Sequence, residues 1–246
     1  MTNTSSIPLD FVTIIGAGRL GRALAATLTA SKTAVRGPLR RGEWEGKISV
    51  NEVVLLCVPD GEVARVASAI ETDAIVGHCA GALTLDALSP HRGFSLHPLL
   101  AITGDHTRFD GAAAAIAATS EETLALARDL ARRLGMTPIA ITDADRTLYH
   151  AAAVLAANYL VALEETAATI GARVGLERRH LATLAESALS NWARDGAASL
   201  TGPIVRGDAA VVDRQRKEIA AVFPSLLPLW DALTDRTRTI AAGARQ

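Results

Sequence analysis

Apolar positions along the chain fall into short runs of the kind that form buried strands. The first run, FVTII at residues 11–15, leads through a glycine-rich turn into residues 20–30, where alanine and leucine favour a helix. Six further runs follow between polar or helix-like segments: TAVRGPLRR (33–41), EVVLLCVPD (52–60), AIVGHCAGAL (74–83), GFSLHPLL (93–100), GAAAAIAAT (111–119) and MTPIAIT (136–142). This alternation predicts a mostly parallel sheet covered by helices.

The pattern changes after residue 142, beyond which no convincing strand follows. Residues 146–170, 177–194, 209–221 and 225–242 all have helical character. We therefore expect an α/β domain over residues 1–142 and an all-α domain over residues 143–246. The segment from Tyr149 to Ile170 is apolar nearly all round, so we expect it to be buried within the helical domain or at a subunit contact. A homodimer through the C-terminal helices is the more economical explanation.

The turn after the first strand, GAGRLG, carries three glycines at Gly16, Gly18 and Gly21. Gly16 allows a sharp turn, Gly18 lets the backbone approach a pyrophosphate, and Gly21 lets the following helix lie close to the strand. The helix N-terminus, where Arg19 and Leu20 lie, offers N–H groups and a positive dipole end to phosphates. Placed between a strand and a helix, the motif predicts a dinucleotide-binding Rossmann domain; a plain strand-turn-helix connection is the alternative.

Composition narrows the class of protein. The chain has 246 residues, 49% of them hydrophobic and 21% charged, with a formal net charge of −1, which describes a soluble globular protein with material for two domains. The near-zero charge argues against a nucleic-acid surface. Because the N-terminus lacks a signal pattern and charges interrupt the apolar stretches, we expect a cytoplasmic protein without membrane spans. Cys57 and Cys79 have no CxxC spacing, so we expect buried thiols and neither a disulfide framework nor a metal site.

Six motifs resemble a known family. They are GAGRLG, VPD at residues 58–60, HCAGAL at 78–83, SLHPL at 95–99, YHAAAVLAANYLVAL at 149–163 and LTGPIVRGD at 200–208. Together they resemble predicted bacterial oxidoreductases with an N-terminal Rossmann domain and a C-terminal helical domain of unknown function. That family is related to 6-phosphogluconate dehydrogenase, ketopantoate reductase and pyrroline-5-carboxylate reductase. The resemblance implies the fold and an NAD(P) cofactor; Cys79 departs from it, since serine is expected there.

Arginines near the end of the second predicted strand indicate which cofactor binds. An NAD site usually has an acidic residue there, whereas a 2′-phosphate needs arginine. The chain has no acid at this place but has Arg36, Arg40 and Arg41, and the last two are expected to bind the phosphate. NADP is therefore favoured over NAD, with a solvated basic loop as the alternative.

Other residues are expected to line the cofactor crevice at the carboxyl ends of strands. Pro59 and Asp60 follow the third strand, and Gly81 follows the fourth. Asp60 is equally well explained as the N-cap of a helix that starts at Gly61. His78, in the same HCAGAL motif, is either near the nicotinamide or a satisfied core histidine.

His97 is the first candidate for catalysis. Pro98 is expected to stop the strand and leave the imidazole at the crevice rim, where a pKa near neutrality suits proton exchange with a carbonyl or imine. A structural histidine is the alternative.

In the helical domain, Asn158 needs a specific partner if it is buried, and His150 is expected about 80° from it on the helix. The related dehydrogenases carry a lysine in this helix, and here it is absent.

Arg206, in the LTGPIVRGD segment, is a candidate for binding a substrate carboxylate in a bidentate manner. The alternative is an ordinary turn at Gly202–Pro203 in which Asp208 caps the next helix. The riskiest expectation is that His97, His150, Asn158 and Arg206 converge on one cleft. Two functions remain open: a reductase that transfers hydride from NADPH to a small keto or imino acid, and a catalytically inactive NADP-binding sensor or scaffold.

Overall fold

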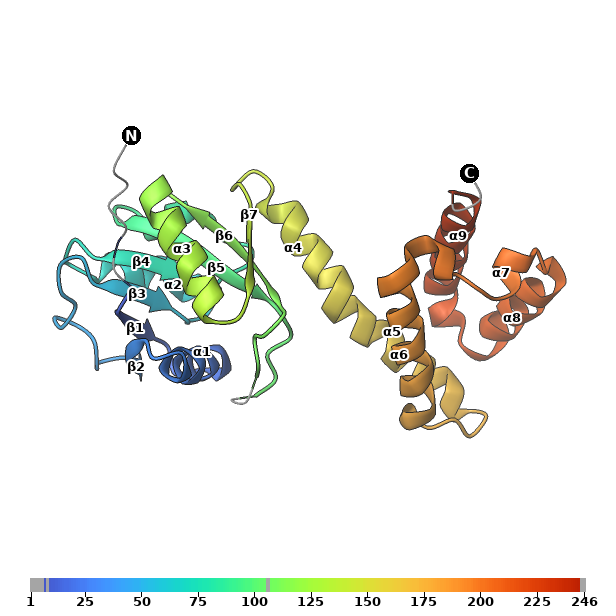
Figure 1. Ribbon diagram of the computed structural model, residues 1–246. Coiled ribbons are helices and arrows are strands. Elements are labelled where there is room, and N and C mark those ends of the chain that lie inside the picture. Colours follow the sequence, from blue (N-terminus) through green and yellow to red (C-terminus); the bar gives the residue numbers. More distant parts are fainter. Residues whose placement is uncertain (1–6, 8, 105–106, 244–246) are drawn as a thin grey trace. The chain divides into compact units, whose positions relative to one another are not determined.

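The apolar runs of the first half form one seven-stranded sheet. The computed structural model describes residues 7, 9–104 and 107–243, and its strand order is β2-β1-β3-β4-β5-β6-β7 (Figure 1). The strands are β1 (Phe11–Ile15), β2 (Ala34–Leu39), β3 (Val53–Leu56), β4 (Ile75–His78), β5 (Arg92–Leu99), β6 (Ala113–Ala118) and β7 (Thr137–Ala140). Every neighbouring pair is parallel except β5 with β6. The predicted fold class, a mostly parallel Rossmann-type sheet followed by helices, is confirmed.

The order of the strands reverses beside β1, because β2 pairs with one of its edges and β3 with the other. In an open parallel sheet, ligands bind beyond the carboxyl ends of the strands at such a reversal. The turns that follow β1 and β3 therefore occupy the place where this fold binds a ligand.

Helices cover both faces of the sheet. They are α1 (Arg19–Ala30), α2 (Asp60–Ser68) and α3 (Glu121–Arg133), with a 3-10 turn at Leu85–Leu88. Val12 and Ile14 of β1 belong to the cluster that includes α1 and α3, whereas Ile15 packs with α2 on the opposite face. Successive side chains of a strand point to opposite faces, so a strand that is covered on both sides needs a continuous apolar run.

From Arg146 onward, every described regular element is helical. Helix α4 (Arg146–Val154) leads through a π-helical turn (Leu155–Tyr159) into α5 (Leu160–Ala172). The remaining elements are α6 (Arg178–Asp195), a 3-10 turn (Gly196–Ser199), α7 (Pro203–Arg206), α8 (Ala209–Val222), a 3-10 turn (Pro224–Leu226) and α9 (Leu227–Gly243). The helices predicted from the sequence are therefore present, with one interruption inside the first and a further single turn at α7.

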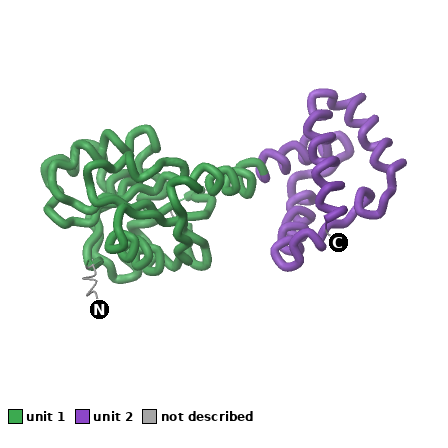
Figure 2. Tube along the Cα trace, turned by 90° about the horizontal axis from the view of Figure 1, so that it is seen from above, with its two compact units in different colours: residues 1–159 green, residues 160–246 purple. Residues whose placement is uncertain are grey.

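Two compact units divide the chain between Tyr159 and Leu160 (Figure 2). The sequence places the boundary at residue 142, where the last strand ends. Helix α4 nevertheless belongs with the sheet, because the side chain of Arg146 at its start is 1% exposed and donates to the hydroxyl of Ser95 in β5 at 2.9 Å.

Large apolar side chains of the segment from Tyr149 to Ile170 are exposed. Leu155, Tyr159 and Val161 are 62%, 60% and 63% exposed. Residues 146–172 form a helix that, by length and composition alone, is apolar enough to cross a membrane. The segment crosses the boundary between the two units, and the subunit contact expected from the sequence stays a prediction.

Candidate active site

The turn between β1 and α1 packs so closely that two of its glycines are required. Gly16 has a φ of +116°, and a Cβ there would lie 2.3 Å from the carbonyl oxygen of Cys57. A Cβ at Gly21 would lie 1.9 Å from the carbonyl oxygen of Gly16. Both glycines therefore hold the start of α1 against the ends of β1 and β3, as expected from the motif.

Gly18 has a different environment from the other two glycines. A Cβ at this position would meet nothing within 4 Å, and Gly18 lines an open pocket. It is the N-cap of α1, and no side chain caps that helix. The N–H groups of the first turn, at Arg19 and Leu20, therefore face a space that an anion could fill.

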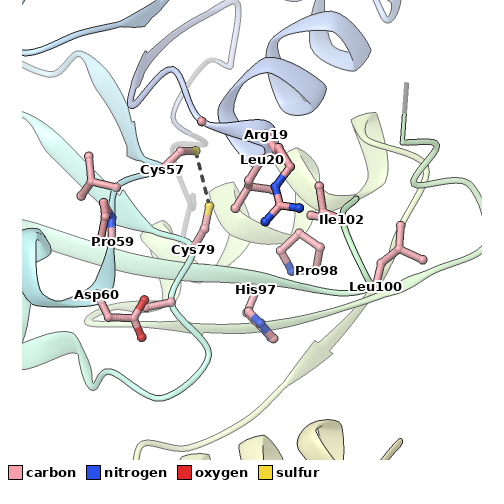
Figure 3. Close-up of a pocket in the computed structure, with 13 residues that line it drawn as sticks. Arg19, Leu20, Cys57, Pro59, Asp60, Cys79, His97, Pro98, Leu100 and Ile102 are labelled. Carbon is pink, nitrogen blue, oxygen red and sulfur yellow. Dashed lines mark hydrogen bonds between the residues drawn. The ribbon is translucent and has the colours of Figure 1, made fainter. Parts of the chain in front are cut away.

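The pocket beside this turn has a volume of about 470 Å³ and is lined by the glycine turn, by the segments that follow β3 and β4, and by the end of β5 with the residues after it (Figure 3). Its lining residues are Gly18, Arg19, Leu20, Cys57, Val58, Pro59, Asp60, Cys79, Ala80, His97, Pro98, Leu100 and Ile102. We call it the larger pocket. The start of α1 and His97, which are far apart in sequence, both line this pocket.

Strand β5 continues past the proline that was expected to end it. The strand runs to Leu99, and Pro98 lies opposite Ala114 of β6. Pairing of β5 with β4 stops at Ser95, so the strand has a free edge beyond that residue, and a proline without an N–H is tolerated there. His97 still lines the larger pocket, but from within a paired strand rather than from its end.

His97 contacts two side chains of α4. Its Nδ1 lies 2.6 Å from the hydroxyl of Tyr149, and its ring centroid is 6.1 Å from that of His150. A Cβ at Gly81 would lie 2.9 Å from Nε2 of His97 and 2.6 Å from Cδ2 of His150. Gly81 therefore leaves the room in which the two imidazoles meet, and the expected proximity of His97 and His150 is present.

The proton affinity of His97 differs from the expectation. Burial, and next the electrostatic effect of the neighbouring His150, lower its pKa to about 4, although the Asp60 carboxylate acts in the opposite direction. The sequence suggested a pKa near neutrality because it does not show that the ring is enclosed. At neutral pH His97 is therefore an uncharged imidazole, and any proton it donates must come from its neutral N–H.

Arg146 connects α4 to the sheet beneath these histidines. Besides Ser95, it binds Asp143 at 3.0 Å, and that carboxylate in turn accepts from the amide of Leu85 at 3.0 Å. Its Nη1 is buried without a hydrogen-bond partner among the described residues. The buried guanidinium lowers the pKa of Tyr149, while burial, the larger effect, raises it.

His78 is fully buried in β4, as the core interpretation expects. Its Nδ1 accepts from the amide of Ala80 at 3.2 Å, and burial lowers its pKa to about 4. Its Nε2 makes no hydrogen bond with the described residues, so the side chain is only half satisfied.

A second pocket, of about 340 Å³, lies on the other side of the glycine turn and carries three arginines. Arg40 and Arg41 line it beside Gly16 and Ala17, together with Arg65 of α2. Glu62 binds both Arg41, at 3.2 Å, and Arg65. We call it the arginine pocket.

The third arginine considered from the sequence has a structural role. Arg36 donates to Thr13 at 3.1 Å and to the carbonyl of Lys47 at 3.0 Å, and it forms an ion pair with the buried Glu52. These contacts tie β2 to β1, so Arg36 is not available to a ligand.

Asp60 and Pro59 line the larger pocket, where the sequence placed them. The N-cap interpretation of Asp60 is not what is observed: α2 begins at Asp60 itself, Pro59 is its N-cap, and no side chain caps it. The Asp60 carboxylate is thus free to act on His97 across the pocket.

Asn158 and Arg206 do not have the surroundings expected from the sequence. Asn158 is exposed and lies in the π-helical turn, so the 80° separation from His150, which assumes α-helical geometry, does not apply. Arg206 ends α7 and pairs with Asp208 at 3.1 Å. Asp208 is the N-cap of α8, but its side chain makes no capping bond. Arg206 lies in the second unit, and its approach to His97 stays a prediction.

Sequence analysis missed Tyr149, Arg146 and Arg65 as members of the site. Tyr149 is adjacent to His150 in the YHAAAVL motif, so the motif already contained the signal. Arg65 follows Glu62 by three residues in the helix after VPD, a spacing that places both on one helix face. Only the folded chain shows that Arg146 is buried.

Among the described residues, no group of three or more histidine, cysteine or acidic side chains could hold a metal ion.

Solved structures share this fold over nearly the whole chain. Protein TM1727 from Thermotoga maritima is 25% identical, with a TM-score of 0.79, and the match covers 96% of this chain and 100% of that one. A Bacteroides fragilis protein provisionally named as an NADP oxidoreductase is 18% identical, with a TM-score of 0.78 and coverage of 95% and 100%. Plasmodium falciparum pyrroline carboxylate reductase, solved with NADP bound, is 13% identical, with a TM-score of 0.57 and coverage of 96% and 100%.

Among curated proteins no sequence matches the chain. The family described as a domain of unknown function, DUF2520, matches residues 112–237, more than half of the 246 residues. This segment begins before β6 and extends through α4 into α9, so it includes Tyr149 and His150. The chain therefore belongs to the DUF2520 family, joined to a Rossmann-type sheet, as its sequence motifs predict.

Proposed function

We propose that the chain is an NADP-dependent oxidoreductase that reduces a small keto or imino acid. The observation that supports this best is the larger pocket, in which the uncapped N-terminus of α1 and the imidazole of His97 line one cavity. An anion-binding turn beside a buried proton-transfer group is the combination that a dinucleotide-dependent reduction needs.

The residues present fit NADP in two places. The open space at Gly18 and the free N–H groups of α1 suit the pyrophosphate. Arg40 and Arg41, in the arginine pocket, suit the 2′-phosphate, and they are the two residues that directly follow β2, although the Glu43 carboxylate accepts from the amide of Arg40 at 2.7 Å and Glu62 also lines this pocket. The fold shared with a reductase that has NADP bound supports the same assignment.

The cofactor, when bound as NADPH, supplies the hydride, so this chain must supply orientation and a proton. His97 is neutral, and the 2.6 Å contact places its Nδ1 against the Tyr149 hydroxyl. If Tyr149 donates to Nδ1, the imidazole proton sits on Nε2. His97 then donates that proton from Nε2 to the substrate oxygen while it takes the Tyr149 proton at Nδ1.

This relay avoids the imidazolium that burial disfavours. Its other product is a Tyr149 phenolate: burial raises the pKa of Tyr149 and so disfavours this anion, and the Arg146 guanidinium offsets part of that cost. His150, whose ring centroid lies 6.1 Å from that of His97, is proposed to contact the same substrate. Among the roles considered from the sequence, Arg206 is proposed to hold the substrate carboxylate and Asn158 to orient the substrate.

The alternative is an NADP-binding protein without turnover. The absence of lysine between residues 146 and 172, where the related dehydrogenases carry a catalytic one, favours this alternative. The Tyr149–His97 contact favours the enzyme, because a sensor has no need for a proton relay.

A two-step experiment tests the proposal. Thermal shift with NADPH and NADH is expected to show stabilisation by NADPH. NADPH oxidation is then followed with a panel of keto and imino acids, using His97→Gln as the matched variant. We expect turnover by the wild type and its loss in His97→Gln, with NADPH binding retained. Binding without turnover on any acid would favour the sensor, and no binding of either nucleotide would contradict both functions.

We also propose that the chain forms a homodimer through its C-terminal helices. The second unit exposes large apolar side chains on α5 and α6, among them Leu184 and Trp192, which are 68% and 61% exposed. Exposed apolar side chains that lie close together on the surface of a soluble protein often mark a protein contact, which supports this proposal.

A further inference from the structure

The only two cysteines of the chain face each other at the larger pocket. Their Sγ atoms are 3.9 Å apart, and both thiols are free (Figure 3). Neither the proposed hydride transfer nor the packing of the sheet requires a thiol at either place, and the family resemblance leads one to expect serine at Cys79. The pair therefore calls for a separate explanation.

The backbone holds these cysteines in a register that allows a bond between them. Leu56 of β3 lies opposite His78 of β4, so Cys57 and Cys79 are the next residues of two neighbouring parallel strands. Neighbouring strands are about 4.8 Å apart, and the Cα atoms of disulfide-bonded cysteines are usually about 4.4–6.8 Å apart. Small side-chain rotations can therefore bring the sulfur atoms together without moving either strand.

The two thiols differ in their access to solvent. Cys57 is half-buried, whereas Cys79 is only 7% exposed. The contact with Cys57, and next burial, raise the pKa of the Cys79 thiol well above its usual range. Because Cys57 is the more exposed thiol, it meets a small reagent in the pocket first. The thiolate is the reactive form, so the raised pKa keeps Cys79 less reactive, and Cys79 is placed to react second.

We propose that Cys57 and Cys79 form an oxidation site, at which a hydroperoxide that enters the larger pocket converts the thiol pair into an intramolecular disulfide. In the first step the Cys57 sulfur attacks one peroxide oxygen, the O–O bond breaks, and an alcohol or water leaves, so that Cys57 becomes a sulfenic acid. In the second step the Cys79 sulfur attacks the Cys57 sulfur, the S–O bond breaks, and hydroxide leaves with the Cys79 proton as water. The pair loses two electrons, which the peroxide gains.

The disulfide itself does not depend on the proposed function, but its control by cofactor does. A bound dinucleotide would fill the larger pocket beside Gly18 and cover the path to Cys57. Only the cofactor-free fraction would then react, so NADP⁺ is expected to slow oxidation by a factor of one plus the ratio of its concentration to its Kd.

The first experiment treats the reduced, cofactor-free full chain with hydrogen peroxide and follows intact mass. We expect a loss of two hydrogen atoms, reversal by dithiothreitol, and monomeric migration on a non-reducing denaturing gel. Cys79→Ser is expected to stop at a sulfenic acid that dimedone traps, whereas Cys57→Ser is expected to react far more slowly. Addition of oxygen atoms to both wild-type cysteines without a disulfide, or a disulfide between chains, would overturn the proposal.

The second experiment adds NADP⁺, which contains no hydride to complicate the reaction with peroxide. Slower disulfide formation that follows the occupancy measured by thermal shift supports access through the larger pocket. If NADP⁺ stabilises the protein but leaves the rate unchanged, the proposed route to Cys57 is wrong. If NADP⁺ does not bind at all, the proposed function fails, and the disulfide is judged from the first experiment alone.

Discussion

The imidazole of His97 reaches across from the sheet to a helix that begins after the last strand. Its partner Tyr149 is 52 residues away in sequence, and the contact exists because Arg146 fixes the start of α4 against β5. Sequence reasoning found His97 and His150 as candidates from their motifs. It could not predict the pKa of His97 or the role of Tyr149, since both depend on which side chains enclose the ring.

Removing the Tyr149 hydroxyl tests the proposed relay. In Tyr149→Phe, His97 keeps its burial but loses the donor at Nδ1, so turnover of a carbonyl substrate should fall by roughly 10²-fold or more, with NADPH affinity unchanged. Nitrogen chemical shifts of labelled histidine should also show a change in the His97 tautomer. Tyr159→Phe is the matched control, because Tyr159 is the only other tyrosine and is 60% exposed. An unchanged tautomer in Tyr149→Phe would refute the relay.

The depressed pKa of His78 predicts how stability depends on pH. An unfolded histidine titrates near pH 6.5, whereas His78 titrates at about pH 4 in the folded chain. Below pH 6.5 the His78 imidazole therefore binds a proton in the unfolded state but not in the folded state. The free energy of unfolding falls as the pH decreases toward 4.

For this residue the expected loss is about 2 kcal/mol between pH 7 and pH 5. Urea unfolding of the wild type and of His78→Asn at the two pH values measures it, because asparagine cannot take up the proton. The difference between wild type and variant should shrink at pH 5. A difference that is the same at both pH values would mean that His78 does not titrate with a lowered pKa.

Arg40 and Arg41 are predicted to set the preference for NADPH. Replacing both by alanine removes two charge-assisted contacts to the 2′-phosphate, so NADPH affinity should fall by roughly tenfold to a hundredfold. NADH affinity should stay nearly constant, because NADH lacks that phosphate. Arg132→Ala, in α3 and outside both pockets, is the control. Calorimetry with both nucleotides measures the effect, and equal losses for the two would refute the assignment.

At the scale of elements, the strands and α1 were predictable because their patterns depend on local spacing. Continuous apolar runs such as VVLL of β3 occur where a strand is covered on both faces, and the three glycines mark the strand-to-helix turn. The continuation of β5 past Pro98 was not predictable, because it requires knowing that β4 stops pairing at Ser95. The π-helical turn within the apolar helix has no sequence signal that we can identify.

Two glycines of the same turn should respond oppositely to substitution by alanine. Gly21→Ala places a Cβ against the carbonyl oxygen of Gly16, so the helix must move and the thermal midpoint should fall by several degrees. Gly18→Ala meets open space and has an ordinary φ of −73°, so stability should fall much less, by the small cost of alanine at an N-cap. Its methyl group, however, enters the space assigned to the pyrophosphate and should weaken NADPH binding. Full NADPH affinity in a folded Gly18→Ala would contradict the placement of the cofactor.

At the scale of the whole molecule, we propose that the exposed apolar helices contact a second copy of the chain. The segment 146–172 is long enough to span a bilayer, but it contains Glu164 and Glu165, and its first residue, Arg146, is buried against the sheet of the first unit. A second copy of the chain would cover these apolar side chains and remove them from water without placing the charges in lipid.

The homodimer is tested by light scattering at micromolar concentration. The wild type should have the mass of two chains, and Leu184→Glu should shift it to one, because a carboxylate at a buried apolar contact is strongly unfavourable. Since Leu184 is 68% exposed in the single chain, the variant should still fold. Val50→Glu is the matched control: Val50 is 62% exposed but lies in the first unit. A wild-type monomer that floats free of lipid vesicles would refute the dimer, whereas a monomer that binds vesicles would assign the apolar helices to a membrane instead.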